Sequence, residues 1–255
     1  MKLCIDGRLF DADTLDVDPS KPETFFSDGV DETVVLRGGR PRRFEGFCQR
    51  IAAGARALNL SWTMPPTQLQ SWIARLSLEN RDADGAVRVL LGRARKDGAQ
   101  TIVLATMKRP SVDVVCAALV TETARSEPSA PFTRLAHPER LAAVEALRRH
   151  DAEVAIILNT AGRVAGAITG DVFALIDGAV VTPPLPEHAT GSLSRADVMR
   201  LAQAVECPLT VEMLRSAQEW AIADGIGFRP VIELDGVPVG GGELGLITSL
   251  LAARI

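Results

Sequence analysis

The stretch that most constrains the fold is residues 152–184, AEVAIILNTAGRVAGAITGDVFALIDGAVVTPP. It contains three short apolar runs, residues 154–158, 172–176 and 179–182. The first ends at Asn-Thr-Ala-Gly, the second at Asp-Gly, and the third at Pro-Pro, which cannot continue a hydrogen-bonded ladder. This spacing predicts three strands, with a hairpin turn at Asp177 and Gly178. The small residues between the first two runs are expected to let backbone approach a ligand closely.

Periodicity along the rest of the chain predicts a mixture of helices and strands. Residues 45–60 and 65–78 carry apolar side chains at helical spacing, and Thr67 is expected to cap the second helix. A further helix is expected over residues 217–221. The segments predicted to form strands around a turn are 86–95 and 101–106.

A polar, proline-bearing stretch near the middle of the chain predicts a boundary between two domains. We expect a small α/β domain over residues 1–110, a linker over 111–127 and a larger β-rich domain over 128–255. The 255 residues are enough to give both domains a hydrophobic core.

Composition excludes several functional classes. A net charge of −4 offers no basic footprint for nucleic acid. Four scattered cysteines without a Cys-x-x-Cys pair, and three dispersed histidines, predict free thiols and no metal site. The N-terminus lacks a basic-then-apolar signal, and no apolar run approaches the roughly 18 residues of a membrane span. We therefore expect a cytoplasmic protein that does not contact membranes.

Several segments resemble the fold-type IV pyridoxal-phosphate (PLP) enzymes. Residues 28–33, DGVDET, match the family's D-G-V-F/Y-E-T except at Asp31. Residues 162–173 follow the frame of its G-x-V-x-E-G-x-x-S-N-x-F, and residues 182–185, TPPL, come at the expected distance. The family includes branched-chain and D-amino-acid aminotransferases and aminodeoxychorismate lyase. The resemblance implies an α+β, two-domain architecture like that of D-amino-acid aminotransferase, with a small α/β N-terminal domain, a larger β-rich pseudo-barrel and a homodimer.

Three positions depart from the family's pattern where the resemblance places cofactor contacts. Ala136 falls where the family has the lysine that forms a Schiff base with PLP, and the chain has no lysine beyond Lys108. A Schiff base needs a primary amine, so Ala136 cannot form one. Gly166 replaces the glutamate that pairs with the pyridine nitrogen, and Asp224 replaces a phosphate-binding hydroxyl. We therefore expect that PLP, the family cofactor, is not used and that the protein has no cofactor.

The candidate site residues are polar groups at the family's ligand positions. The resemblance assigns Arg50, Leu193 and Ser194 to an anionic group, and Ser194 is also expected to cap a helix, whose first N–H groups favour anions. Alternating arginines around Arg93 are typical of a solvated strand edge or of a carboxylate clamp. The candidates for catalysis are His137, Asp31 and Asp224, and those for ligand binding are Arg50, Arg93, Thr169, Leu193, Ser194 and Arg229.

Three functions remain open at this point. The first is a PLP-independent enzyme, or a binder of a small anionic metabolite, that reuses the family's cleft. The second is a non-catalytic homologue that acts as a dimeric scaffold or a subunit. The third is a PLP-dependent aminotransferase or aminodeoxychorismate lyase, which requires Lys108 or a more distant lysine to reach the site, or PLP held without a covalent bond.

Overall fold

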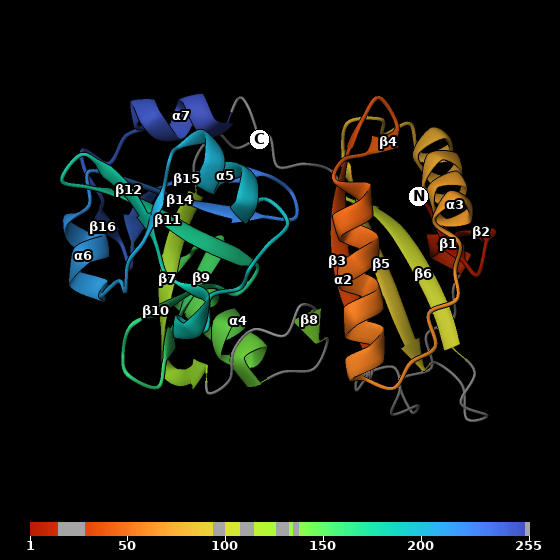
Figure 1. The fold of residues 1–255 in the computed structure, drawn as a ribbon, viewed down its shortest axis with the longest axis horizontal. Coiled ribbons are helices and arrows are strands. Elements are labelled where there is room, and N and C mark those ends of the chain that lie inside the picture. The colour runs from red at the N-terminus through yellow and green to blue at the C-terminus, as the bar shows by residue number, and fades with distance from the viewer. Residues whose placement is uncertain (15–28, 94–99, 108–114, 126–132, 135–137, 253–255) are drawn as a thin grey trace. The chain divides into compact units, whose positions relative to one another are not determined.

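A computed structural model describes residues 1–14, 29–93, 100–107, 115–125, 133–134 and 138–252 (Figure 1). The chain divides into two compact units. Unit 1 comprises residues 1–109 and 130–136, and unit 2 comprises residues 110–129 and 137–255. Each unit is built around its own sheet.

The sheet of unit 1 has seven strands in the order β2-β1-β6-β5-β3-β4, with β8 paired to β3. All pairings among its described strands are antiparallel, both between consecutive strands such as β1 and β2 and between strands far apart in the sequence such as β1 and β6. The strands are β1 (Lys2–Ile5), β2 (Arg8–Asp11), β3 (Gly29–Arg37), β4 (Arg40–Pro41), β5 (Ala86–Arg93), β6 (Gln100–Met107) and β8 (Thr133–Arg134).

Two helices cover one face of this sheet (Figure 1). Helix α2 (Phe44–Ala57) packs on β3, and helix α3 (Pro66–Asn80) packs on β1 and β6. The apolar residues that predicted these helices are buried on the side facing the sheet. Both helix predictions are confirmed, but Thr67 is not the cap, because α3 already begins at Pro66.

The sheet of unit 2 has nine strands in the order β10-β9-β7-β15-β14-β11-β12-β13, with β16 paired to β15. Parallel pairs join β7 to β9, β15 to β7 and β12 to β13. The strands are β7 (Val115–Arg125), β9 (Val154–Asn159), β10 (Val164–Ala167), β11 (Gly170–Ile176), β12 (Ala179–Thr182), β13 (Val205–Glu206), β14 (Glu219–Asp224), β15 (Phe228–Leu234) and β16 (Val237–Pro238).

The three strands predicted from residues 152–184 are confirmed as β9, β11 and β12. Asp177 and Gly178 form the hairpin turn between β11 and β12, both with positive φ (50° and 78°). The small-residue segment between β9 and β11 differs from expectation, because it contains the buried strand β10. The helix predicted at 217–221 is wrong, since β14 runs there between β11 and β15.

Helices α4 (Pro138–His150), α5 (Arg195–Leu201), α6 (Val211–Ser216) and α7 (Leu246–Ala252) surround the sheet of unit 2, together with the short turn η2 (Leu185–Glu187). In unit 1, a similar turn, η1 (Ala12–Thr14), follows β2. Strand β7 occupies most of the segment expected to be a linker, and the predicted three-part domain division stays a prediction. No helix in the described ranges is both long and apolar enough to cross a membrane.

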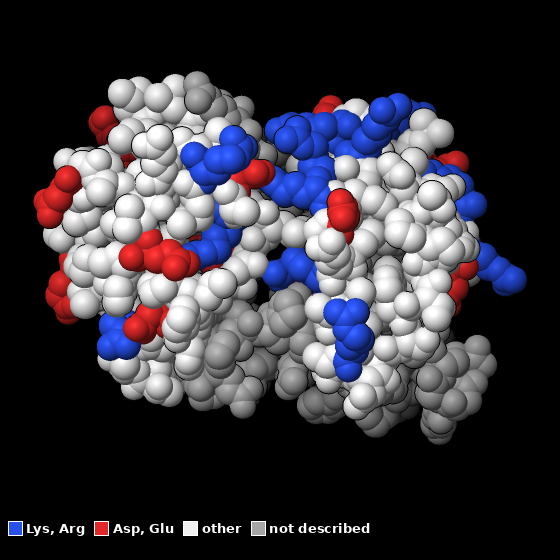
Figure 2. Space-filling view, viewed as in Figure 1, with Lys and Arg blue, Asp and Glu red and all other residues white. Residues whose placement is uncertain are grey.

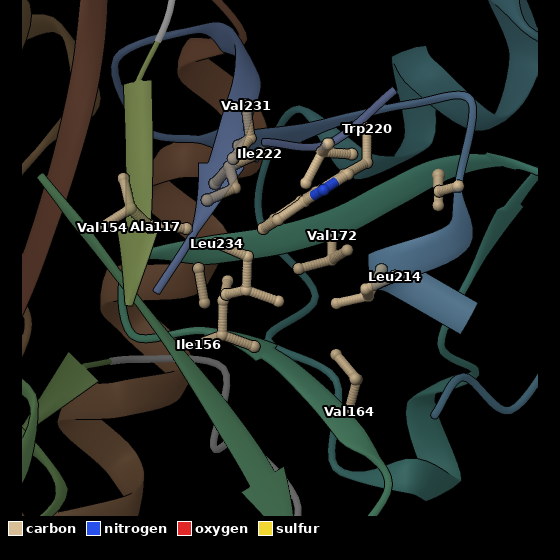
Figure 3. Packing of buried hydrophobic residues seen from close by; sticks show 14 of the residues in the cluster. Ala117, Val154, Ile156, Val164, Val172, Leu214, Trp220, Ile222, Val231 and Leu234 are labelled. Atoms are coloured by element: carbon tan, nitrogen blue, oxygen red, sulfur yellow. The ribbon is translucent and has the colours of Figure 1, made fainter. Parts of the chain in front are cut away.

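The largest hydrophobic core of unit 2 centres on Trp220 (Figure 3). Its side chain lies among Val172 from β11, Ile222 from β14 and Leu214 from α6. The alternation of β11 and β14 places these residues on one face and leaves Phe173 and Ala221 for a second cluster beneath α5. The strands are therefore buried on both faces, and their ends are held in fixed positions.

Candidate functional site

The end of strand β14 lies beside the start of strand β11 in unit 2. Gly170 and Asp224 are partners in the antiparallel register of these strands. A Cβ atom at position 170 would lie 2.3 Å from the Ala223 carbonyl oxygen and 2.7 Å from the Asp224 Cβ. Any other residue would force the strands apart, so glycine permits the close approach of Asp224.

Four donors surround the carboxylate of Asp224. Its Oδ1 accepts the backbone N–H of Ile226 at 2.9 Å and of Gly227 at 3.2 Å. Its Oδ2 accepts from Arg229 Nη2 at 2.5 Å and from Thr169 Oγ1 at 3.4 Å. The Asp224 side chain is only 1% exposed. The donors around residues 224–229 are therefore those that a buried anion needs, and the anion they hold in this structure is the Asp224 carboxylate itself.

One nitrogen of Arg229 is buried without a hydrogen-bond partner. The Nε atom is out of contact with solvent and has no acceptor in the described part of the chain. An unpaired buried donor costs about 1–3 kcal/mol, and more when the group is charged.

Two serines fasten the loop before α5 to the end of β14. The Ser192 hydroxyl donates to the Ala223 carbonyl at 2.9 Å, and the Ser194 hydroxyl donates to the Asp224 carbonyl at 2.8 Å. Ser194 occupies the N-cap position, but it makes no side-chain bond to the helix. The expected capping role is therefore wrong, because the Ser194 hydroxyl points to β14 and its oxygen accepts no N–H of the helix.

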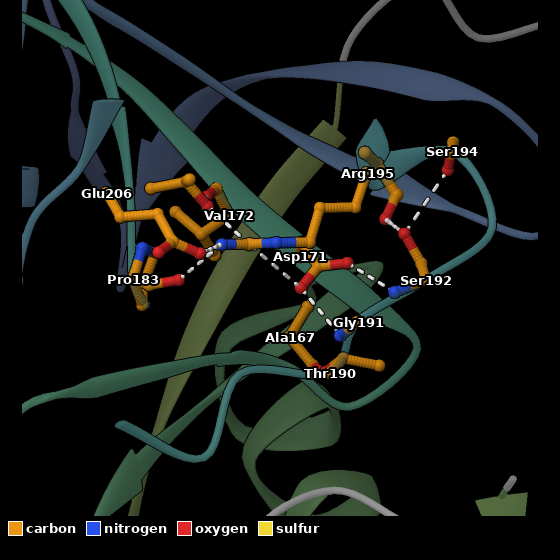
Figure 4. Close-up of polar contacts among 12 residues, drawn as sticks. Ala167, Asp171, Val172, Pro183, Thr190, Gly191, Ser192, Ser194, Arg195 and Glu206 are labelled. Atoms are coloured by element: carbon orange, nitrogen blue, oxygen red, sulfur yellow. Dashed lines mark hydrogen bonds and ion pairs between the residues drawn. The ribbon is translucent and has the colours of Figure 1, made fainter. Parts of the chain in front are cut away.

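The same loop is held by the buried carboxylate of Asp171 (Figure 4). Asp171 accepts the backbone N–H of Gly191 at 2.8 Å and of Ser192 at 2.6 Å, and its side chain is fully buried. Arg195 Nη1 lies 3.3 Å from the carboxylate. The first N–H groups of this loop are thus already hydrogen-bonded inside the protein.

Arg195 connects the loop to two further strands (Figure 4). Its guanidinium donates to the Thr182 hydroxyl and the Pro183 carbonyl, both at 2.9 Å, and to the Glu206 carboxylate at 2.8 Å. The side chain is 8% exposed. Because the planar guanidinium carries five donors in a fixed geometry, a single residue can join β12, β13 and the loop.

Gly166 leaves little room for a side chain at the position that the resemblance assigns to an acid. Its φ is 149°, which strains any residue other than glycine. A Cβ atom there would lie 3.0 Å from the Gly170 carbonyl oxygen and 3.2 Å from Thr190 Oγ1. The register between β9 and β10 shifts at this point, between Val164 and Gly166. The backbone, as well as the residue type, is therefore unsuited to a glutamate.

The carboxylate of Asp31 in unit 1 is paired with Arg88. The Nε of Arg88 donates to Oδ1 at 2.8 Å, and Nη2 donates to Oδ2. Asp31 is 8% exposed. This two-bonded pair joins β3 to β5 and neutralises the charge that was expected to face a ligand.

The next residue along β3, Glu32, forms a second buried ion pair. Its Oε1 accepts from Arg50 Nε of α2 at 2.8 Å, and the side chains of Glu32 and Arg50 are 8% and 16% exposed. Burial raises the pKa of Glu32 to about 7, because the desolvation of the carboxylate outweighs the opposing effect of Arg50. Arg50, expected to bind an anion, thus has a carboxylate partner within unit 1.

The structure brings four of the predicted residues together. Thr169, Ser194 and Arg229 all bond to Asp224 in unit 2, and Leu193 precedes Ser194. Asp31 and Arg50 lie in unit 1, in separate ion pairs. Residues 136 and 137 lie outside the described residues, and so does the side chain of Arg93, whose backbone pairs with Gln100.

Sequence reasoning missed Asp171, Arg195, Glu32 and Arg88 as partners. Arg195 directly follows the predicted site residue Ser194, and Glu32 lies inside the matched DGVDET segment, so both carried a signal. Their partners lie on other helices and strands, and only the fold brings them together. Among the described side chains, no three His, Cys, Asp or Glu residues gather to hold a metal ion.

Curated relatives match part of the chain. A D-alanine aminotransferase of Staphylococcus aureus (strain MSSA476) is 30% identical over 89 residues, which cover 32% of this chain and 32% of that protein. A probable branched-chain-amino-acid aminotransferase of Aquifex aeolicus (strain VF5) is 32% identical over 104 residues, 38% of this chain and 33% of that protein. The chain thus matches about a third of the length of these relatives.

Solved structures share the fold over nearly the whole chain. The branched-chain aminotransferase of Thermoproteus uzoniensis, solved with norvaline, has a TM-score of 0.81 at 23% identity and covers 100% of this chain and 93% of that chain. A hypothetical aminotransferase from Mycobacterium tuberculosis, in a PLP-bound form, has a TM-score of 0.81 at 20% identity and covers 99% and 96%. These matches confirm the two-domain α+β fold-type IV architecture.

The expectation that the protein has no cofactor is contradicted by these comparisons. The relatives are aminotransferases, and proteins of the same fold are solved with PLP, with PMP or with N-(5'-phosphopyridoxyl)-L-glutamate. The missing lysine was therefore too narrow a basis for excluding PLP. Gly166 offers no acid for the ring of such a molecule, and the guanidinium of Arg229 is already paired with the Asp224 carboxylate.

A family model matches most of the chain. The model for amino-transferase class IV matches residues 29–234, which include β3, both helices of unit 1 and the strands of unit 2 as far as β15. The similarity in fold to the solved aminotransferases and the match to the family model cover the same segments over most of the chain. The chain therefore belongs to the class IV aminotransferase family.

Proposed function

We propose that the protein binds a small ligand with a phosphate or carboxylate group at the turn formed by residues 224–229, and that no lysine is linked covalently to this ligand. PLP and pyridoxamine 5'-phosphate (PMP) are the first candidates, because solved structures of the same fold carry them. When bound, PLP supplies an aldehyde and an electron-withdrawing ring. A carboxylate-bearing metabolite has the same anionic chemistry.

The observation that carries this proposal is the buried Nε of Arg229, which has no partner among the described residues. Another nitrogen of the same guanidinium, Nη2, already donates to the Asp224 carboxylate at 2.5 Å. A guanidinium can hold two oxygens side by side, so one further anionic oxygen fits its donor geometry. The Ser192 and Ser194 hydroxyls fix the neighbouring loop against the same strand end.

The small number of lysines in the sequence supports the non-covalent part of this proposal. The chain has only Lys2, Lys21, Lys96 and Lys108, and Ala136 stands where the resemblance places the lysine. Lys2 pairs with Asp11 at 2.8 Å in unit 1. Charge and hydrogen bonds, rather than an imine, are therefore proposed to hold the ligand.

Comparing PLP with PMP tests this mode of binding. PMP has an amine in place of the aldehyde, so it cannot bond covalently to a lysine. Calorimetric titration is expected to give Kd values for PLP and PMP that agree within about threefold. Arg229→Met is expected to weaken both by about tenfold or more, because it removes a charged donor.

Arg200→Met is the matched control for that variant. Arg200 lies on α5 with a 70% exposed side chain, and its pairing with Asp197 is a surface ion pair. Binding by this control is expected to equal that of the wild type. If PLP, PMP, inorganic phosphate and acetate all fail to bind the wild-type protein, the proposed function is wrong.

A second candidate, a non-catalytic homologue, is favoured by the ion pairs of unit 1. Asp31 with Arg88 and Glu32 with Arg50 neutralise one another inside the unit, as structural pairs do. The relatives' substrates, D-alanine and branched-chain amino acids, give the assay. Turnover of either with added PLP, at a rate above that of PLP in buffer, would exclude this candidate.

A further inference from the structure

The carboxylate of Asp224 has the surroundings of a bound anion. It accepts from two backbone N–H groups, from one guanidinium and from one hydroxyl, and its side chain is 1% exposed. A buried carboxylate with this many donors holds them as firmly as a ligand anion would. The backbone of β14 fixes its position, because Asp224 N also bonds to the Gly227 carbonyl at 2.9 Å.

Carboxylates lie on strand β14, beside Arg229, and on strand β11, which pairs with β14. Asp224 lies next to Arg229, and Asp171 lies on the neighbouring strand β11, paired with Arg195. Arg195 is shared with a third carboxylate, that of Glu206. A ligand with a doubly charged phosphate therefore meets one partly neutralised guanidinium and a nearby carboxylate.

We propose that Asp224 is a specificity-determining residue that competes with the ligand's anionic group for Arg229 and for the N–H groups of residues 226 and 227. The site then disfavours phosphate dianions and favours singly charged carboxylate ligands. This inference rests on the proposed function, since it concerns the same turn. It assigns a role to a residue at which this chain departs from the family's pattern.

The geometry explains why a smaller neutral side chain changes the preference. Serine at position 224 removes the charge and leaves Arg229 with no carboxylate at 2.5 Å. The two backbone N–H groups then lose their acceptor as well. A phosphate with three terminal oxygens can satisfy all of these donors together, so its affinity is expected to rise.

Titration with inorganic phosphate and with acetate tests this competition. Asp224→Ser is expected to bind phosphate at least about tenfold more tightly than the wild type, with a smaller gain for acetate. Asp224→Asn keeps the size of the side chain and one acceptor oxygen, so its affinity for phosphate is expected to lie between those of the wild type and Asp224→Ser. It replaces Asp224→Ser in the test if the serine variant does not fold. Circular dichroism of each variant checks folding.

Asp197→Ser is the matched control for charge. Asp197 lies on α5 and its side chain is 33% exposed, so its loss changes the net charge equally without touching Arg229. Equal gains in Asp197→Ser and Asp224→Ser would overturn the inference, because a general charge effect explains them. Wild-type binding that is as tight as that of Asp224→Ser would also overturn it and would leave the proposed function standing. If neither the wild type nor Asp224→Ser binds phosphate, acetate or PLP, both the inference and the proposed function are wrong.

Discussion

Glu32 lies in an environment unlike that of a surface carboxylate. It lies on β3 with an 8% exposed side chain, and its pKa is raised to about 7 despite the bond to Arg50. A raised carboxyl pKa means that the folded protein holds this proton more tightly than the unfolded chain does. The contribution to stability is complete below pH 4.5, the ordinary value, and is lost as the pH rises through about 7.

Glu32→Gln is therefore expected to remove this pH dependence. The wild type should lose up to roughly 3 kcal/mol of unfolding free energy between pH 4 and pH 9 through this group, whereas the variant should not. Urea unfolding followed by circular dichroism at several pH values measures the difference. Glu45→Gln, on the exposed start of α2, should behave like the wild type. Parallel curves for wild type and Glu32→Gln would contradict the assignment.

Residue types alone predicted some of the site but not its pairing. Asp224 and Arg229 were identified because they replace groups at the family's ligand positions. Their bond at 2.5 Å depends on the turn between β14 and β15, which brings side chains five residues apart together. Asp31 illustrates the limit, because its partner Arg88 comes from a strand 57 residues away.

At the scale of elements, turn residues predicted the strands of unit 2 better than periodicity predicted its helices. Asp177-Gly178 and the two prolines marked the ends of β11 and β12 correctly. Residues 217–221 showed apolar spacing typical of a helix, yet β14 forms because β11 and β15 pair with it on both sides. Pairing between distant strands cannot be seen in a local pattern, and here it overrides helix propensity.

The loop before α5 depends on a single buried guanidinium. Arg195→Met removes the donors to Asp171, Thr182, Pro183 and Glu206 and leaves the Asp171 carboxylate buried without its charged partner. We expect a loss of about 3–5 kcal/mol in unfolding free energy. Arg200→Met on the same helix, exposed in its side chain, should change stability by no more than about 0.5 kcal/mol.

Combining Arg195→Met with Asp171→Asn in a double-mutant cycle measures the coupling free energy between these two side chains. Asparagine removes the unpaired charge, so the double variant should lose less than the sum of the single variants, by about 1–3 kcal/mol. Urea denaturation of the four proteins in the cycle measures this coupling. Additive losses would show that Asp171 and Arg195 act independently.

At the scale of the whole molecule, charge is distributed unevenly over a chain of net charge −4. In Figure 2 basic side chains gather over the hairpin of β3 and β4, where Arg37, Arg40 and Arg42 are exposed.

The homodimer, the cytoplasmic location and the absence of nucleic-acid and membrane partners stay predictions from the sequence. Fold and family were predictable because segment order survives substitution, whereas a cofactor cannot be excluded from one missing side chain.

We propose that the class IV aminotransferase fold of this chain holds an anionic ligand without a covalent bond to lysine. The most direct test is borohydride reduction of the protein loaded with one equivalent of PLP, followed by peptide mass spectrometry. Borohydride fixes any carbon–nitrogen double bond between the aldehyde and an amine. We predict that the ligand separates from the denatured chain and that no lysine carries it. One pyridoxyl group per chain on a single lysine, at position 2, 21, 96 or 108, would contradict the account.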